Sequence, residues 1–112
     1  MKFGRFEIHS VSDGFFRLDG GAMFGVVPKV IWEKNNTPDD KNRILLGVNP
    51  LLIISEQRKI LVDTGIGNKD DEKFKSMFAV SRKPTIEESL AKLNLSVNDI
   101  NIVVSTHLHW DH

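Results

Sequence analysis

The chain has 112 residues, with 15 Lys and Arg against 15 Asp and Glu, four His and no Cys. This length suits one small domain, and the absence of Cys excludes a disulfide scaffold, a cysteine nucleophile and a thiolate metal site. The balanced charge creates no overall field that would attract nucleic acid or an anionic membrane. The longest strongly apolar run, residues 51–54, is too short to span a bilayer, and no secretory signal is present. We therefore expect a cytoplasmic protein that binds neither nucleic acid nor membrane.

The first third of the chain predicts short strands and loops. Residues 3–11 alternate in the pattern of a half-buried strand. Residues 15–18 follow a Ser-Asp-Gly turn and can pair back on that strand as a hairpin. The glycine-rich residues 19–25 are expected to be irregular. Residues 26–32 contain a proline and are expected to form a loop or an edge segment.

Two clearer strands follow. Residues 44–55 are rich in branched aliphatic side chains but contain Pro50, which predicts a bend or an edge at that point. Residues 59–63 are short, apolar and bounded by Thr-Gly, as in a buried strand. The three polar residues between the two runs predict a tight hairpin.

The second half of the chain predicts two helices and one more strand. Residues 70–79 carry apolar side chains at helical spacing, and Thr85 and Glu88 have the spacing of a capping box at a helix start. Residues 100–105 have the composition of a buried strand. This order favours a mixed α/β sheet with the helices on one face. The apolar stripe of the second helix consists of Ile86, Leu90 and Leu93.

Four candidate metal ligands lie in the last six residues, in the pattern His-x-His-x-Asp-His directly after the predicted strand. Residues i and i+2 of an extended backbone face the same way, so His107 and His109 can present both imidazoles to one ion. A turn after His109 would let Asp111 and His112 reach a second ion. Nitrogen and carboxylate ligands suit Zn²⁺, with Mn²⁺ or Fe as alternatives, and two such ions would activate a bridging water. The alternatives are a polar chain end and an Asp111 that only caps a following helix.

Residues 105–112, Ser-Thr-His-Leu-His-Trp-Asp-His, resemble the signature of the metallo-β-lactamase superfamily. Residues 60–65 resemble the strand of that family that ends in an acidic residue, and residues 95–100 resemble its approach to the metal strand. The resemblance implies an α/β fold, namely the N-terminal half of an αββα sandwich. Such a half contains a mixed, mostly antiparallel sheet with two helices on one face. Residues 1–112 would then be a single truncated domain.

The resemblance also implies roles for individual residues. His107 and His109 would bind the first metal, and Asp111 and His112 the second. Asp111 would in addition be catalytic, because it would orient the attacking water. Asp63 would act outside the ligand set and hold the ligand loop by hydrogen bonds, as such carboxylates do. The alternative for Asp63 is a plain hydrogen-bond acceptor in a turn at the end of a strand.

Members of the family use a further His, a bridging Asp and a final His, which this chain does not contain. His9 is the one other histidine, and we expect it to be an ordinary strand residue. We therefore expect a fragment that is inactive alone and binds no metal or one ion weakly, where the complete domain would bind two Zn²⁺. Half a sandwich would leave an apolar sheet face open. We expect self-association through that face or docking on the missing half.

The function that the resemblance implies is hydrolysis of an ester, a lactone or a related bond of a small molecule by a metal-activated hydroxide. The lactonase-like branch is the most similar, and residues 20–28 resemble its mobile loop, in which Met23 and Phe24 would contact substrate. Core packing of these two side chains is the alternative. A catalytically dead half-domain that acts as an interaction module is the alternative function. An aspartic protease, suggested by Asp63-Thr64-Gly65, is disfavoured because two helices are predicted after it and no Gly follows Gly67.

Overall fold

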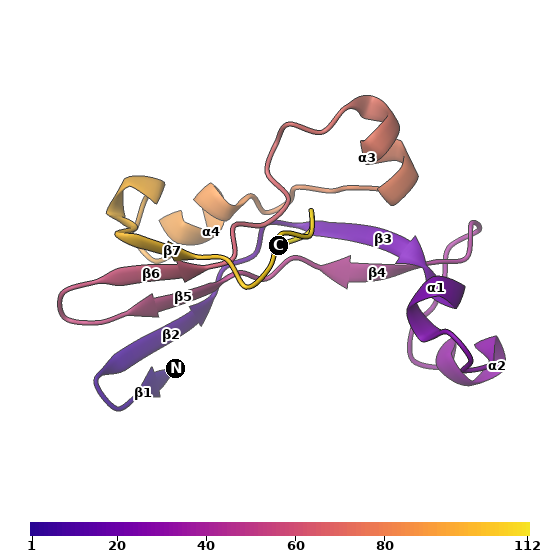
Figure 1. Ribbon diagram of the computed structural model, residues 1–112, viewed down its shortest axis with the longest axis horizontal. Coiled ribbons are helices and arrows are strands. Elements are labelled where there is room, and N and C mark those ends of the chain that lie inside the picture. The colour runs from indigo at the N-terminus through magenta and orange to yellow at the C-terminus, as the bar shows by residue number, and fades with distance from the viewer.

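The computed structural model describes residues 1–112 and contains two β-sheets, of which the smaller extends away from the larger (Figure 1). The larger sheet has the strand order β1-β2-β5-β6-β7, and all its neighbours are antiparallel except β6 and β7, which are parallel. The smaller sheet pairs β3 with β4. The strands are β1 (Lys2–Phe3), β2 (Phe6–Ser10), β3 (Phe15–Asp19), β4 (Arg43–Gly47), β5 (Leu51–Ile54), β6 (Lys59–Val62) and β7 (Ile102–Val104).

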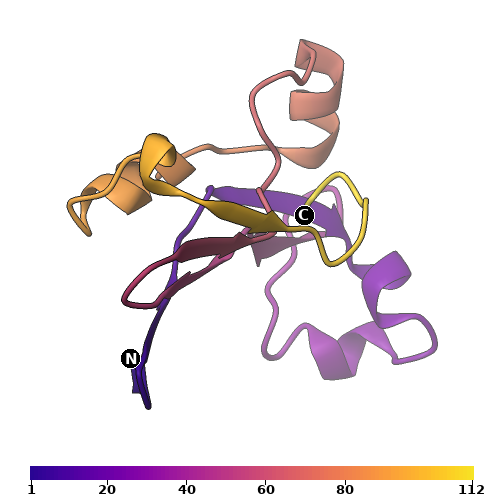
Figure 2. The ribbon, with the colours of Figure 1, turned by 60° about the vertical axis from the view of Figure 1, so that its left-hand side comes forward.

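Four short helices and one 3₁₀ turn accompany the strands. Helices α3 and α4 lie on the same side of the strands, whereas α1 and α2 lie at the far end of β3 and β4 (Figures 1 and 2). The expected α/β class, with mostly antiparallel sheet, is confirmed. No helix has the length and apolar character needed to cross a membrane. The helices are α1 (Gly20–Phe24), α2 (Lys29–Trp32), α3 (Glu72–Phe78), α4 (Ile86–Ala91) and the 3₁₀ turn η1 (Val97–Asp99).

Both helices of the second half begin at a side-chain cap; the sequence predicted the capping box of the second helix, but only the apolar spacing of the first. Asp71 accepts a hydrogen bond from the backbone N–H of Phe74 and caps α3. Thr85 accepts from the N–H of Glu88 at 3.2 Å, and Glu88 accepts from the N–H of Thr85 at 3.1 Å, which completes the expected capping box of α4. Both helices therefore begin where side chains satisfy otherwise unpaired N–H groups.

The hairpin expected between the first strand and residues 15–18 is wrong. β3 pairs with β4, with Phe16 opposite Leu46. In the large sheet, β5 pairs with β2 along one edge, and β1 pairs with Phe6 and Glu7 along the other. The chain leaves the large sheet between β2 and β3, and it returns between β4 and β5 near Pro50. The bend expected at Pro50 is thus the point where residues 44–55 divide between two sheets.

The expectations of an irregular segment at residues 19–25 and a loop at 26–32 are also wrong, since these residues form α1 and α2. Asp19 caps α1 by accepting from the N–H of Ala22 at 2.8 Å. Pro28 precedes α2 as its N-cap, where a missing N–H costs nothing. The two helices are joined by a stack of Phe24 on the buried Trp32, with ring centroids 5.0 Å apart.

The hydrophobic core lies between the large sheet and α4. Its buried members are Val11 after β2, Leu52 in β5, Leu61 in β6, and Ile86 and Leu90 in α4. Two residues of the predicted helix stripe, Ile86 and Leu90, are therefore core residues, and Leu93 packs against them.

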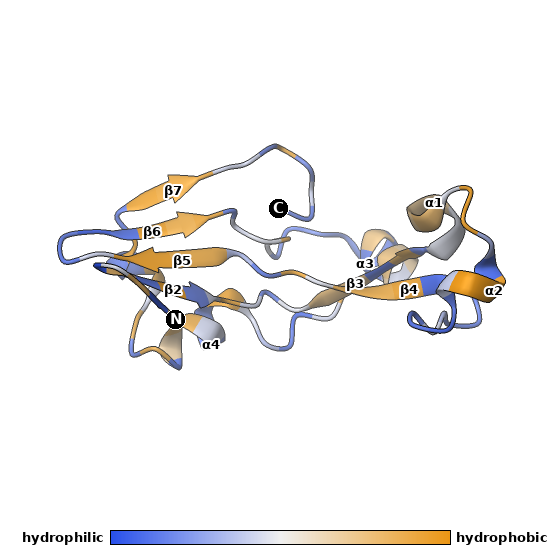
Figure 3. Cartoon of the chain, turned by 90° about the horizontal axis from the view of Figure 1, so that it is seen from below, coloured by the Kyte–Doolittle hydropathy of each residue, from blue (hydrophilic) through white to orange (hydrophobic).

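The opposite face of the large sheet carries no helix. Side chains alternate across a strand, so the neighbours of Leu52 and Leu61 point away from α4. Ile102 and Val104 of β7 are opposite Ile60 and Val62 and lie on the same face. Three side chains of this face are markedly exposed: Leu51 at 37%, Ile102 at 40% and Val104 at 45%. The apolar character of these strands is visible in Figure 3. We call this surface the open face; it consists of Leu51, Ile53, Ile60, Val62, Ile102 and Val104.

The last strand, β7, differs from the buried strand predicted for residues 100–105. All three of its residues are exposed, Val103 to 52%. The reason is that β7 lies at the edge of the sheet, with β6 as its only neighbour. Apolar composition predicted the strand but not its position at the edge.

A buried carboxylate connects the segments around this core. Asp13 is 0% exposed, and its Oδ2 accepts from the N–H groups of Ile66 at 3.0 Å and Gly67 at 3.3 Å. Its Oδ1 accepts from the N–H of Ile86 at 3.0 Å and from the Arg82 guanidinium at 2.9 Å. The sequence predicted only a turn at this position. Asp13 in fact holds two segments in place: the loop after β6, through Ile66 and Gly67, and the start of α4, through Ile86.

Candidate metal centre

The candidate ligands lie in the loop that follows β7, at the edge of the sheet where β6 also ends. Because β6 and β7 are parallel, their carboxyl ends meet, and Asp63 comes beside the start of the ligand loop. The N–H of Asp63 donates to the carbonyl of Val104 at 2.8 Å. At the other end of the loop, the carbonyl of His112 accepts from the N–H groups of Thr64 at 2.6 Å and Gly65 at 2.9 Å. Both ends of the loop are thus tied to the segment after β6.

Asp63 makes the side-chain hydrogen bonds that organise this loop. Its Oδ1 accepts from the backbone N–H of Thr106 at 2.8 Å and from the Thr106 hydroxyl at 2.9 Å. Its Oδ2 lies 3.1 Å from Nδ1 of His112. The backbone N–H of Thr106 and, next, the imidazole of His112 lower the pKa of the Asp63 carboxyl group, against a smaller opposing effect of desolvation. An ionised carboxylate can only accept, so His112 donates its Nδ1–H to Asp63.

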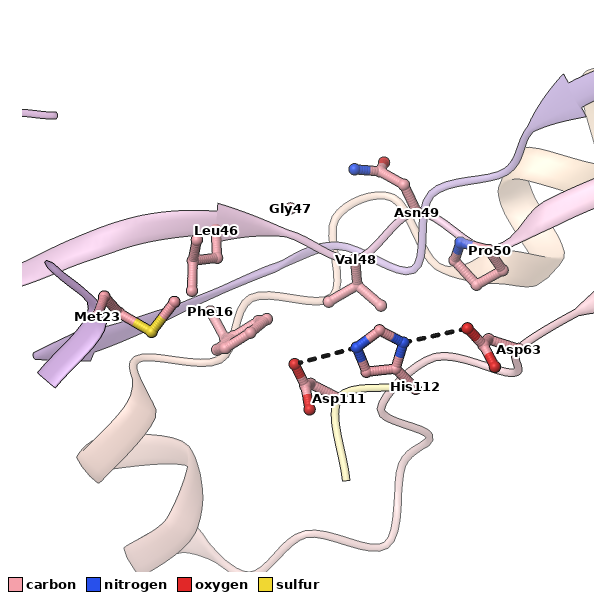
Figure 4. A pocket seen from close by; sticks show the side chains of 10 residues that line it. All are labelled: Phe16, Met23, Leu46, Gly47, Val48, Asn49, Pro50, Asp63, Asp111 and His112. Atoms are coloured by element: carbon pink, nitrogen blue, oxygen red, sulfur yellow. Dashed lines mark hydrogen bonds and ion pairs between the residues drawn. The ribbon is translucent and has the colours of Figure 1, made fainter. Parts of the chain in front are cut away.

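The three histidines of the loop lie together. The ring centroids of His107 and His109 are 4.6 Å apart, and those of His107 and His112 are 4.2 Å apart. Nε2 of His112 lies 3.6 Å from Oδ2 of Asp111. Figure 4 shows the His112 ring between the carboxylates of Asp63 and Asp111. The three imidazoles thus lie close together, and the carboxylates of Asp63 and Asp111 flank the ring of His112.

These side chains do not form a finished metal site. No group of three or more His, Asp or Glu side chains has the arrangement needed to hold an ion. The donor set nevertheless fits a metal in its chemistry, because it offers imidazole nitrogens and a carboxylate, the ligands that Zn²⁺ takes when no thiolate is available. His9 is not part of this group; it lies in β2, with its Nε2 3.3 Å from Glu7.

An aromatic cluster also contacts the ligand loop. The Trp110 ring packs against Phe16 of β3 and against Phe74 and Phe78 of α3, with centroid distances of 4.8, 4.9 and 4.8 Å. The contacts with Phe16 and Phe74 are edge-to-face, which is a favourable geometry for aromatic rings. The sequence predicted Phe74 and Phe78 only as the apolar stripe of a helix. Their spacing did not indicate that they would pack against Trp110, which lies between two candidate ligands.

A pocket opens beside His112 and Asp111 (Figure 4). One wall is apolar and includes Phe16, Met23 and Leu46, and the other carries the carboxylates and the imidazole. Met23 lines this pocket, whereas Phe24 stacks on Trp32 and does not line it. The lining residues are Phe16, Met23, Leu46, Gly47, Val48, Asn49, Pro50, Asp63, Asp111 and His112.

Several known proteins are similar to this chain in sequence or fold. The sequence profile of the metallo-beta-lactamase superfamily matches residues 43–112. A probable metal-dependent hydrolase from Staphylococcus aureus is 42% identical over the whole chain, with a TM-score of 0.92, and the chain spans 41% of its length. The structure of AidC, a dizinc quorum-quenching lactonase in complex with a homoserine product, is 28% identical with a TM-score of 0.72, and the chain spans 36% of it.

A short stretch also matches a curated protein. It is 59% identical to the probable metallo-hydrolase MJ0296 of Methanocaldococcus jannaschii over 27 residues, which are 24% of this chain and 13% of that protein. The structure of the hydrolase AbOPH, 19% identical with a TM-score of 0.71, shares the fold. The chain thus spans less than half the length of each of these relatives.

Proposed function

The chain belongs to the metallo-beta-lactamase superfamily, and from this premise we propose that it contributes the metal-binding loop of a metal-dependent hydrolase that cleaves an ester, lactone or related bond. The observation that carries the proposal is the group of three adjacent imidazoles, His107, His109 and His112, beside a pocket with one apolar wall. The similarity to a probable metal-dependent hydrolase over the whole chain supports it.

Each residue of the loop has a proposed role. His107 and His109 would hold the first ion, preferably Zn²⁺, and Asp111 and His112 would hold the second. When bound, the ions would lower the pKa of a water molecule so that hydroxide is available near neutral pH. The Asp111 carboxylate would accept a hydrogen bond from that water and orient it towards the scissile carbonyl carbon. Asp63 keeps His112 in place through the hydrogen bond at Nδ1.

The proposed substrate is a small molecule with an apolar part next to the scissile bond, such as an aliphatic lactone. In the pocket, Phe16, Met23 and Leu46 offer an apolar wall opposite Asp111 and His112. Such a division places an alkyl or acyl group on one side and the reacting carbonyl on the other. The lactonase among the similar structures supports this substrate class. A cytoplasmic location remains part of the proposal.

The proposal is tested by metal binding in the full-length protein. His107→Ala and His109→Ala should each abolish most Zn²⁺ binding, measured by competition with a chromophoric chelator. His9→Ala removes a histidine outside the loop and serves as the matched control; it should bind zinc like the unaltered protein. Unchanged zinc stoichiometry in both loop variants would overturn the proposal. Hydrolysis of lactones with graded alkyl chains, compared with phosphodiesters, tests the substrate class.

We also propose that residues 1–112 supply only part of the catalytic ligand set and do not turn over substrate without further ligands. A catalytic zinc site needs three protein ligands and one open position. No such set of three converges within these residues. Hydrolysis by the 112-residue chain in saturating Zn²⁺ or Mn²⁺ would contradict this.

The open face supports a second candidate, an interaction module. Leu51, Ile102 and Val104 expose apolar surface on a face without a helix, and surfaces of this kind mark sites of association. The proposed occupant is a complementary half of the same fold or a second copy of the chain. A monodisperse monomer in analytical ultracentrifugation that binds no apolar dye would exclude it. Association without hydrolysis of any ester would favour it over the enzyme.

A further inference from the structure

The hydroxyl group of Thr106 lies between the carboxylate of Asp63 and the imidazole of His107. Its Oγ1 is 2.9 Å from Oδ1 and 3.0 Å from Oδ2 of Asp63, and 3.0 Å from Nδ1 of His107. Oδ2 of Asp63 is shared with Nδ1 of His112, whereas Oδ1 accepts from the backbone N–H and the hydroxyl of Thr106. The contacts of the hydroxyl form a chain of three polar groups that ends on a candidate ligand.

The direction of these hydrogen bonds follows from the number of protons available. A hydroxyl group has one proton to donate, and a carboxylate has none. If the hydroxyl donated to His107, two pairs of oxygen lone pairs would face each other at about 3 Å, with no proton between Thr106 and Asp63. The hydroxyl therefore donates to Asp63. Its remaining lone pairs are then free to accept from Nδ1–H of His107.

This direction decides which nitrogen of His107 can bind a metal. In a neutral imidazole one nitrogen carries the proton and the other is an acceptor, and the hydrogen bond at one nitrogen selects the state of the other. With the proton on Nδ1, the lone pair of Nε2 is free for an ion. The same holds for His112, which donates its Nδ1–H directly to Asp63.

We propose that Thr106 is a positioning residue. Its hydroxyl group donates to Asp63 and accepts from Nδ1–H of His107, so that the proton of His107 stays on Nδ1 and the Nε2 of His107 remains available as a metal ligand. The inference rests on the proposed metal-binding function. It assigns to one carboxylate the orientation of two ligands: His112 by direct contact and His107 through the hydroxyl. Thr106, one position before the ligand motif, thereby orients a ligand without binding the metal.

The first test reads the histidine protons without any metal. Nitrogen-15 NMR of the metal-free full-length protein, at a pH where the imidazoles are neutral, distinguishes Nδ1–H from Nε2–H. His107 should carry its proton on Nδ1 in the unaltered protein and in Thr106→Ser, and shift towards Nε2–H in Thr106→Val, which has the same shape without the hydroxyl. His9 serves as an internal control and should be identical in all three. A His107 spectrum unaffected by Thr106→Val would overturn the proposal.

The second test reads zinc affinity with the same variants. Thr106→Val should weaken Zn²⁺ binding about 10- to 100-fold, as loss of an outer-shell partner does, and Thr106→Ser should restore most of it. A merely structural role for the side chain would not be rescued by Ser alone, because Val is the closer match in volume. Equal affinity of the Val and Ser variants would overturn the inference. Absence of zinc binding in the unaltered protein would instead overturn the proposed function.

Discussion

Two aspartates, Asp13 and Asp63, each bind several segments of the chain together, and they do so in different surroundings. Asp13 is 0% exposed and satisfies three backbone N–H groups and one guanidinium. The side chain of Asp63 is 15% exposed, and its partners are Thr106 and His112 of the ligand loop. The first carboxylate joins elements of the core, and the second joins the core to candidate ligands.

The difference separates a carboxylate that stabilises the fold from one that positions candidate metal ligands. A buried charge is tolerable only when it is paired and hydrogen-bonded, and Asp13 meets this condition entirely from within the fold. Asp63 instead uses its hydrogen bonds to hold groups whose other faces stay open to solvent. We therefore expect substitutions at Asp13 to affect stability and substitutions at Asp63 to affect metal binding.

The largest effect is expected for Asp13→Ala. It leaves Arg82 without its ion-pair partner and several backbone N–H groups without an acceptor, so the free energy of unfolding should fall by about 3–5 kcal/mol. Urea denaturation monitored by circular dichroism measures this. Asp40→Ala, at an exposed aspartate, is the matched control and should change stability by less than about 0.5 kcal/mol. A comparable loss in both variants would remove the distinction between the two aspartates.

Asp63→Asn should have its main effect on the metal. Asp63 has a φ of 63°, a left-handed conformation that Asn also adopts readily, so the backbone is expected to persist. The amide cannot accept at both positions, and Zn²⁺ affinity should fall about 10- to 100-fold. Chelator competition gives the affinity, and urea denaturation gives the accompanying change in stability. If stability fell as far as in Asp13→Ala while zinc binding persisted, Asp63 would be a structural carboxylate.

Phe74→Leu tests whether the ligand loop also needs its second anchor. The substitution removes the aromatic contacts of residue 74 with Trp110 and Phe78, each worth about 0.5–1.5 kcal/mol beyond area burial. The free energy of unfolding should fall modestly, and the fluorescence of Trp110 should change. The fluorescence is measured in a Trp32→Phe background, in which Trp110 is the one remaining tryptophan. Phe3→Leu, at a side chain that is 69% exposed, is the control. Identical Trp110 emission in all variants would show that α3 does not support the loop.

The smallest effect concerns a third aspartate, which is neither buried nor near the ligands. The N–H of Ala22 and the amide of Asn42 lower the pKa of Asp19 below its usual 3.8. Because the folded-state pKa is depressed, its stabilising contribution is present above pH 3.8 and is lost as the pH falls through the folded value. Asp19→Asn keeps a good helix cap but cannot titrate, so it should flatten the acid limb of stability against pH and change little at pH 7. An unchanged acid limb would contradict the assignment.

The sequence by itself determined the features that depend on neighbouring residues. Thr85 and Glu88 are three positions apart, so their capping box follows from helix geometry alone. Pro50 lies between β4 and β5 because its ring is excluded from a continuous ladder. The candidate ligands could be named as well, because their spacing is itself the signal. Local chemistry was insufficient at residues 19–32, where the cap at Asp19 and the stack on Trp32 made helices from residues expected to be irregular.

Only the tertiary structure decided which distant residues meet. Asp13 reaches Ile66 across 53 positions and Ile86 across 73, and nothing in a Ser-Asp-Gly turn indicates either partner. The meeting of Thr106 with Asp63, 43 positions apart, depends on β7 lying parallel to β6 at the edge of the sheet. A motif specifies which atoms can bind a metal. The order of the strands specifies which carboxylate holds those atoms in place, because hydrogen bonds between distant segments form only after the sheet has brought the segments together.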